Sequence, residues 1–141
     1  MIEPIAKREL LENNALLLDA VDGGDYATYA SLVHESVTAF EPEARGHRIA
    51  GLPFHRFFLE HRAAQQCGGA RAGCGGAARR SEMSEPHVRL LGDTAIVSYV
   101  RLTQSSGGVV AAEETRVWRV VGGRWRNVHF HRSRTGGACH E

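Results

Sequence analysis

Hydrophobic residues recur near helical spacing along the first part of the chain. This pattern runs from Pro4 to Val21 and predicts an amphipathic helix, with Pro4 suited to its first turn. The run Asp22-Gly23-Gly24 predicts the end of the helix, and Asp25 can cap a short second one. We therefore expect a helical hairpin. Its apolar face would be formed by Ile5, Leu10, Leu11, Leu17, Leu18, Val21, Tyr26, Tyr29, Leu32 and Val33.

The pattern changes several times in the middle of the chain. Residues 37–40 have the composition of an extended segment, and Pro42 interrupts it. The glycines at 46 and 51 predict a turn before a third helix that begins near Pro53. That helix carries the densest aromatic cluster of the chain, which consists of Phe54, Phe57 and Phe58.

Two segments offer almost nothing to a hydrophobic core. Residues 67–80 read CGGARAGCGGAARR, and their glycines raise the entropy cost of ordering, so we expect a flexible loop there. Residues 134–141 lack any packing signal and predict a disordered tail. The sequence therefore predicts a single domain over residues 1–133.

Alternating apolar and polar residues in the second half of the chain predict β-strands. The pattern covers residues 87–104, interrupted at Gly92-Asp93, and then 109–121 and 124–132. Turns are predicted at 105–108 and 122–123. Helices followed by long antiparallel strands indicate an α+β fold, in which the sheet curls around the helices and buries its apolar face against them.

Composition narrows the range of partners. The 141 residues, 43% of them hydrophobic, suffice for one domain with its own core. A net charge of +1 gives no broad field that would attract nucleic acid or an anionic membrane. The sequence also shows no signal peptide and no membrane-spanning run. We therefore expect a soluble, cytoplasmic protein with a protein or small-molecule partner.

Cysteine and histidine spacing predicts neither disulfides nor a metal site. The chain has three cysteines, Cys67, Cys74 and Cys139. Their number is odd, and two of them lie in the glycine-rich segment, so we expect reduced thiols. His129, His131, Cys139 and His140 do not have the spacing of a zinc motif. We expect no metal and no cofactor.

Five motifs in order through the chain resemble the association domain of calcium/calmodulin-dependent protein kinase type II. They are TAFEPEARG (38–46), FHRFFLE (54–60), YVRLTQ (99–104), EETRVW (113–118) and NVHFHRS (127–133). GGDYATY (23–29) resembles the first helix junction of that family, so the similarity extends over about residues 9–133. The resemblance implies a conical α+β half-barrel similar to nuclear transport factor 2, with N-terminal helices packed against a curved, mostly antiparallel sheet.

The resemblance implies a noncatalytic hub that assembles into a large two-layered ring. The expected partners are further copies of the chain and kinase subunits that carry the same domain. No glycine-rich ATP loop, HRD or DFG motif occurs in the sequence, so we expect a freestanding hub without kinase activity. No basic amphipathic helix suits calmodulin, so a link to calmodulin signalling would rest on the resemblance alone.

Three arginines, Arg101, Arg116 and Arg132, lie on three successive predicted strands beside apolar residues. Guanidinium groups on an apolar face need partners, so one interpretation is internal ion pairs with Glu41, Glu43 or Glu114. The resemblance implies a different role, because hub domains have a deep pocket lined by arginines at these positions and by a histidine that matches His55. Such a pocket, with Tyr99 beside it, would bind a small carboxylate or an acidic peptide. Both interpretations stay open at this stage.

The alternative function is a small enzyme, because conical folds of this kind also host isomerases, dehydratases and hydrolases. Its candidate residues are Glu114, Tyr99 and His55. The neighbouring arginines would keep a carboxylate ionised, which disfavours proton abstraction by it. No acid at helical spacing is evident that would orient His55, which suggests a structural or ligand-contacting role.

Strand register decides which residues share a face. A three-residue turn at 122–124 would place Trp118 opposite Val128, Arg116 opposite Phe130 and Glu114 opposite Arg132. A two-residue turn would instead place Arg116 opposite His129. In regular alternation, Trp125 shares a face with His129 and His131, and these three are our candidates for an interface between subunits.

Overall fold

The computed structural model describes residues 2–68 and 79–135. It contains three α-helices and one short 3-10 helix within these ranges: α1 (Ile2–Gly23), α2 (Tyr26–Leu32), η1 (Pro42–Ala44) and α3 (Pro53–Gly68). The strands are β1 (Val33–Phe40), β2 (Ile49–Ala50), β3 (Arg80–Leu91), β4 (Thr94–Ser105), β5 (Gly108–Val121) and β6 (Arg124–Arg134).

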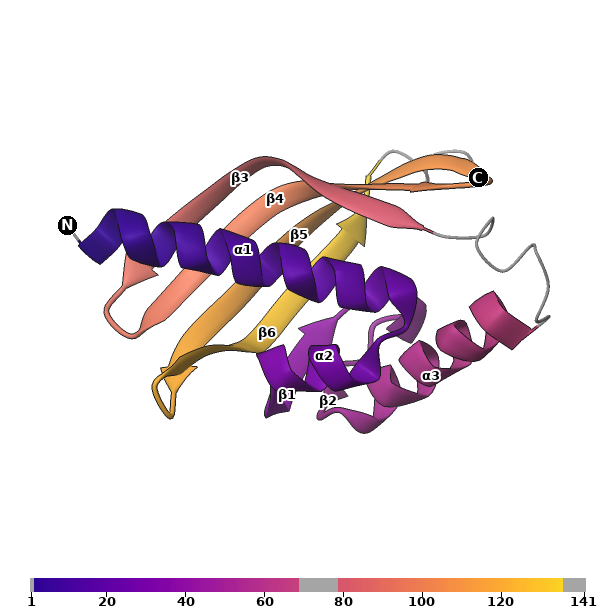
Figure 1. Ribbon diagram of the computed structural model, residues 1–141, viewed down its shortest axis with the longest axis horizontal. Helices are drawn as coiled ribbons and strands as arrows, with labels where there is room; N and C mark the ends of the chain where they lie inside the picture. Colours follow the sequence, from indigo (N-terminus) through magenta and orange to yellow (C-terminus); the bar gives the residue numbers. More distant parts are fainter. Residues whose placement is uncertain (1, 69–78, 136–141) are drawn as a thin grey trace.

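The six strands form one sheet in the order β2-β1-β6-β5-β4-β3. All neighbours are antiparallel except β1 and β6, which run parallel. Figure 1 shows α1 lying across one face of the curved sheet, with α2 and α3 continuing the helical layer beside it. The predicted α+β fold, with N-terminal helices packed against a curved and mostly antiparallel sheet, is confirmed.

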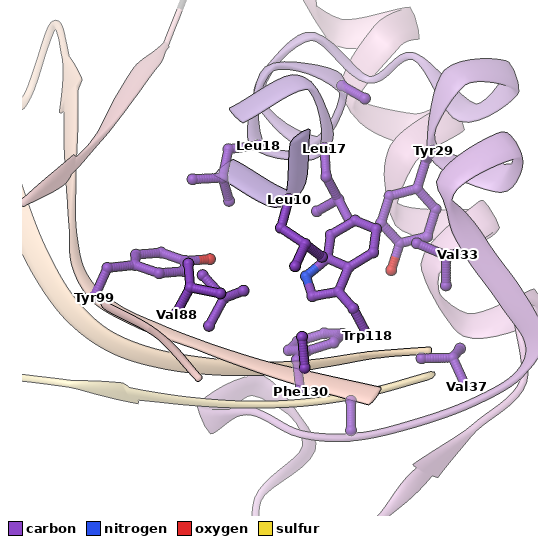
Figure 2. Close-up of a cluster of buried hydrophobic side chains, with 14 of the residues drawn as sticks. Leu10, Leu17, Leu18, Tyr29, Val33, Val37, Val88, Tyr99, Trp118 and Phe130 are labelled. Atoms are coloured by element: carbon purple, nitrogen blue, oxygen red, sulfur yellow. The ribbon is translucent and has the colours of Figure 1, made fainter. Parts of the chain in front are cut away.

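The core lies between α1 and the inner face of the sheet. Leu10, Leu17 and Leu18 project from one side of α1 and are buried beside Trp118, which is fully buried (Figure 2). The indole nitrogen of Trp118 donates a hydrogen bond to the side-chain oxygen of Asn14 at 3.0 Å. Because both side chains are buried, this bond satisfies polar groups that would otherwise destabilise the core.

The helical hairpin forms much as predicted. The side chain of Asp25 accepts hydrogen bonds from the backbone nitrogen and the hydroxyl of Thr28, so the predicted cap of the second helix is confirmed. Val33, which we placed on that helix, instead begins β1. Its β-branched side chain is fully buried against the core from the strand.

Two predicted boundaries around the glycine-rich segment were wrong. The helix α3 continues to Gly68, and β3 begins at Arg80 rather than His87, which shortens the predicted loop from both ends. Residues 69–78 of that loop lie outside the described residues. The early part of β3 is an edge strand that pairs only with β4, so it needs no apolar alternation to form.

The predicted tail also begins later than expected. Arg134 pairs with Ala112 in the sheet, and the backbone nitrogen of Thr135 donates to the carbonyl oxygen of Ala111 at 3.1 Å. Main-chain bonding thus orders residues whose side chains carry no packing signal. The rest of the tail, 136–141, lies outside the described residues.

The hairpin between β5 and β6 combines both registers that the sequence left open. Its turn has two residues, Gly122 and Gly123, both at positive φ, so the turn predicted at 122–123 is confirmed and the two-residue register holds next to it. Trp118 therefore pairs with Asn127 rather than with Val128.

An irregularity of one residue then follows at Val128. Beyond it, Arg116 pairs with Phe130 and Glu114 with Arg132, as predicted. The extra residue on β6 acts as a β-bulge, which shifts the pairing by one position part-way along the hairpin.

Among the described helices, none combines the length and the apolar composition that a bilayer crossing requires.

The turn between α1 and α2 packs directly against α3, which yields a first test. Gly24 has a φ of +71°, and a Cβ atom there would lie 2.6 Å from the backbone nitrogen of Ala63 and 2.7 Å from the carbonyl oxygen of Leu59. We expect Gly24→Ala to lower the free energy of unfolding by about 2 kcal/mol or more, from backbone strain and overpacking together. Urea denaturation measures the change.

Gly23→Ala is the matched control. A Cβ atom at Gly23 meets nothing within 4 Å, and its φ is not positive. We expect this variant to be as stable as the parent or slightly more stable. Equal losses in both variants would contradict the close packing of this turn on α3.

Candidate functional site

A cavity of about 160 Å³ lies between the helices and the inner face of the sheet. All three α-helices and the 3-10 helix contribute to its wall. So do the strands β4, β5 and β6, and Glu41 just after the end of β1. The lining residues are Val21, Tyr29, Glu41, Glu43, Phe54, His55, Phe58, Leu59, Arg62, Arg101, Arg116, Phe130 and Arg132. The cavity thus joins an aromatic and aliphatic lining to a concentration of charged side chains, a composition typical of small-molecule sites.

Arg101 ties the sheet to the end of α1. One guanidinium nitrogen donates to the carboxylate of Glu114 at 3.0 Å, and the other donates to Asp22 at 2.8 Å. Its Nε donates to the hydroxyl of Ser81 at 3.0 Å. The side chain is buried, so these charge-assisted bonds replace its hydration.

Arg116, like Arg101, is held by several partners. It donates to the side-chain oxygen of Asn127 at 2.8 Å and to the hydroxyl of Tyr99 at 3.2 Å. Its guanidinium lies 4.1 Å from the ring centroid of Phe130, and its Nε lies 3.4 Å from the carboxylate of Glu114. The arginine is 2% exposed, and a cation at that depth is stable only with this set of partners.

Glu114 is the anion at the centre of this network. Burial would raise the pKa of its carboxyl group, but the charges of Arg116 and Arg101 and the hydrogen bond donated by Tyr99 lower it below the ordinary value. The carboxylate is therefore ionised although it is only 2% exposed. The two arginines line the cavity, and Glu114 holds them from behind.

A second cluster lies nearer the 3-10 helix. Arg132 donates to Glu41 at 2.9 Å and to Glu43 at 2.6 Å. Glu41 also accepts a hydrogen bond from Nε2 of His55 at 2.6 Å. The expectation that no acid orients His55 was wrong, because Glu41 arrives from the end of β1, outside the helix that carries the histidine.

Three polar groups on the wall of the cavity have no hydrogen-bond partner among the described residues. Nδ1 of His55 and the hydroxyl of Tyr29 are buried and unpaired. The guanidinium of Arg62 makes no direct hydrogen bond or ion pair with a described side chain, although the charges of Asp22 and Glu43 attract it. Arg62 is half-buried, and burial is the main cause that lowers its pKa. The unpaired groups of His55 and Tyr29 are buried, and polar groups of this kind need a partner.

Four of the five pocket residues expected from the sequence line this cavity: His55, Arg101, Arg116 and Arg132. Tyr99 does not line it and lies behind Arg116, with its hydroxyl bonded to Glu114. The three arginines form the internal ion pairs that the sequence suggested, and the same side chains line the cavity.

The sequence reading missed Arg62 and Tyr29 as lining residues. Arg62 follows His55 by seven positions on α3, which is two helical turns, so helical spacing alone would have placed both on one face. Tyr29 was assigned to the apolar face of the hairpin, where it does lie, with its hydroxyl at the cavity.

The outer face of the sheet carries a second polar cluster. Nδ1 of His129 lies 2.7 Å from the hydroxyl of Thr38, and the ring of Phe40 contacts His129 and His131 with centroids 6.1 and 5.6 Å away. Trp125 does not share this face, which corrects our expectation. The bulge at Val128 reverses the alternation, so Trp125 packs against the core while the two histidines point outward.

Within residues 2–68 and 79–135, no group of three or more histidine, cysteine, aspartate or glutamate side chains is arranged to hold a metal ion. Cys139 and His140 of the set considered from the sequence lie outside those residues.

Comparison with known proteins identifies the family. The sequence of residues 6–136 matches the family model for the calcium/calmodulin dependent protein kinase II association domain. The chain belongs to this family. It is 37% identical over 133 residues to the delta subunit of calcium/calmodulin-dependent protein kinase type II from Oryctolagus cuniculus. That match covers 90% of this chain and 23% of the relative, so the chain spans less than a quarter of that kinase subunit.

Solved structures agree with this assignment. The CamKII hub homology domain of Chlamydamonas reinhardtii superposes with a TM-score of 0.79 at 41% identity, covering 92% of this chain and 98% of that one. An NTF2-like protein from Pseudomonas putida KT2440 superposes with a TM-score of 0.71 at 18% identity, covering 92% and 87%. The second comparison shows the fold alone, and it confirms the expected similarity to nuclear transport factor 2.

The buried carboxylate of this association domain predicts a specific dependence of stability on pH. Because the folded-state pKa of Glu114 lies below its ordinary value of 4.5, its contribution is complete above that pH and is lost as the pH falls through the folded-state value. Glu114→Gln should lower the free energy of unfolding on the order of 3 kcal/mol at neutral pH, because Arg101 and Arg116 lose their counter-charge.

Denaturant unfolding between neutral pH and about pH 3 measures this effect. The difference between the parent and Glu114→Gln should shrink as the solution becomes acidic. A difference that stays constant across that range would show that the carboxylate charge does not stabilise the fold.

Proposed function

We propose that this chain is a self-association hub that closes into a two-layered ring, and that its cavity binds a small carboxylate. Membership of the association-domain family is the observation that carries the first part. Assembly, rather than catalysis, is the role that this membership supports.

The outer face of the sheet is the proposed contact surface. It includes the exposed or half-buried side chains of Phe40, Glu113, Thr115, His129 and His131. The edges of the sheet are less suited to pairing with another copy. At one edge β2 has only two residues, and at the other β3 contains Pro86 and an irregularity beside Glu85, which has a φ of +53°.

Native mass spectrometry tests the assembly. We expect a single closed species of many copies, because a head-to-tail contact repeats until the ring closes. Thr115→Arg should reduce it to smaller species, since a long charged side chain in the middle of the contact face cannot be desolvated without cost. Glu12→Lys, an exposed change on α1, should leave the mass unchanged. A monomer or simple dimer in the parent at micromolar concentration would contradict the hub.

The charges of the cavity support carboxylate binding. Four arginines line it, and three of them are neutralised by Glu114, Asp22, Glu41 and Glu43. Arg62 makes no direct ion pair with a described side chain, although the charges of Asp22 and Glu43 attract it at longer range. A carboxylate, from a free acid or from an acidic side chain of a peptide, can accept paired hydrogen bonds from its guanidinium.

A thermal melt with increasing sodium 2-oxobutyrate tests this binding. The Tm of the parent should rise with concentration, as ligand linkage requires. Arg62→Gln should abolish the rise while leaving the assembly intact. Arg56→Gln should retain it, because Arg56 lies on the same helix but points away from the cavity and pairs with Glu60. The absence of a shift in the parent, or an equal shift in both variants, would contradict the carboxylate site.

A further inference from the structure

His55 and Glu41 form a buried histidine–carboxylate pair whose tautomer can be assigned. Burial would raise the pKa of Glu41, but its hydrogen bonds with His55 and Arg132 lower it, so the group is an ionised carboxylate that can only accept. The 2.6 Å contact therefore requires a proton on Nε2 of His55. In the neutral ring, Nδ1 then carries a lone pair. That atom is buried without a partner, on a side chain that lines the cavity.

Tyr29 is a neighbour of His55 on the cavity lining. Its ring centroid lies 5.7 Å from that of His55, and its hydroxyl oxygen is buried without a hydrogen-bond partner. Burial is the main cause that raises the pKa of Tyr29 above its ordinary value, so the phenol keeps its proton at neutral pH. A proton acceptor and a neutral proton donor thus belong to two neighbouring side chains of the cavity lining.

We propose that the cavity catalyses reversible proton abstraction from the carbon next to the ketone of a small 2-oxo acid. Arg62 holds the carboxylate, Nδ1 of His55 accepts the proton, and the Tyr29 hydroxyl donates a hydrogen bond to the ketone oxygen. The activity rests on the proposed carboxylate binding and adds a chemical step to it. Glu41 is a positioning residue that fixes the tautomer of His55.

The step is balanced without a co-reactant. The C–H bond at carbon 3 breaks and its proton moves to Nδ1, which becomes the imidazolium. The electron pair of that bond forms the double bond between carbons 2 and 3, and the ketone oxygen takes the negative charge, where Tyr29 stabilises it. Return of a proton from His55 restores the 2-oxo acid. In heavy water the returned proton exchanges for deuterium, so the reaction is visible without net chemistry.

A 2-oxo acid fits each of these groups. Its carboxylate matches Arg62, which makes no direct ion pair with a described side chain, and its ketone acidifies the neighbouring C–H bond and offers an oxygen to Tyr29. A cavity of about 160 Å³ also limits the substrate to a small molecule. A carboxylic acid without a ketone would also bind at Arg62. It has no C–H bond that a ketone acidifies, so it should stabilise the protein without reacting.

Proton NMR of 2-oxobutyrate in heavy water measures the exchange at carbon 3. We expect the parent protein to accelerate exchange, and His55→Gln to slow it by at least about a hundredfold, which is the usual contribution of a general base. His61→Gln, an exposed change on the same helix, should retain the parental rate. Tyr29→Phe should slow exchange without loss of stability, because the hydroxyl that it removes is buried and unpaired.

Glu41→Gln and Glu43→Gln separate the role of Glu41 from that of a structural ion pair. Both glutamates bind Arg132, but Glu41 alone of the two contacts His55. Glu41→Gln should slow exchange at saturating substrate far more than Glu43→Gln, because the second variant leaves the contact between Glu41 and His55 in place. Equal effects would overturn the positioning role.

The carboxylate-dependent rise in Tm separates this inference from the binding on which it rests. A rise without acceleration of exchange above that of the His55→Gln protein would overturn the catalytic inference and leave carboxylate binding intact. If neither a rise in Tm nor an acceleration of exchange is seen, both carboxylate binding and the catalytic inference are overturned.

Discussion

The buried carboxylate of Glu114 is the constraint on which the rest of the structure depends. An ion at this depth persists only if its partners replace water, and Arg101, Arg116 and Tyr99 do so. Arg101 extends the network to Asp22 at the end of α1, so the same charges set how the long helix meets the sheet. The cavity is the space that remains beside this wall, and its polarity follows from the network rather than from any single residue.

Charge balance changes across the cavity. The arginines of the sheet form direct ion pairs with nearby carboxylates, whereas Arg62 on α3 forms none with a described side chain and is attracted to Asp22 and Glu43 at longer range. Glu41 connects the two sides because it binds both Arg132 and His55. A ligand that carries one negative charge would therefore give Arg62 the direct ion pair that it lacks among the described side chains. Arg62 would then bind the carboxylate and His55 would accept the proton, and both residues line the same cavity.

Local patterns in the sequence predicted the helices, the sheet and the residues around Glu114, because each of these follows from short-range alternation. Contacts between distant segments were harder to predict. The bulge at Val128 has no signature of its own, and it moved Trp125 to the inner face. Glu41 lies fourteen positions from His55, so helical spacing could not reveal it. The polar residues from Arg80 onward form the edge strand β3 because their main chain pairs with β4. Amino-acid composition does not reveal such main-chain hydrogen bonds.

Family membership accounts for the scaffold, and Arg62 gives this chain's cavity a cation without a direct ion pair among the described side chains. The most direct test is a crystal structure of the assembled protein grown with a 2-oxo acid. The account predicts carboxylate oxygens within hydrogen-bond distance of the Arg62 guanidinium, with the ketone oxygen beside the Tyr29 hydroxyl. A cavity that holds only water at a saturating concentration of the acid, with Arg62 turned to another partner, would contradict it.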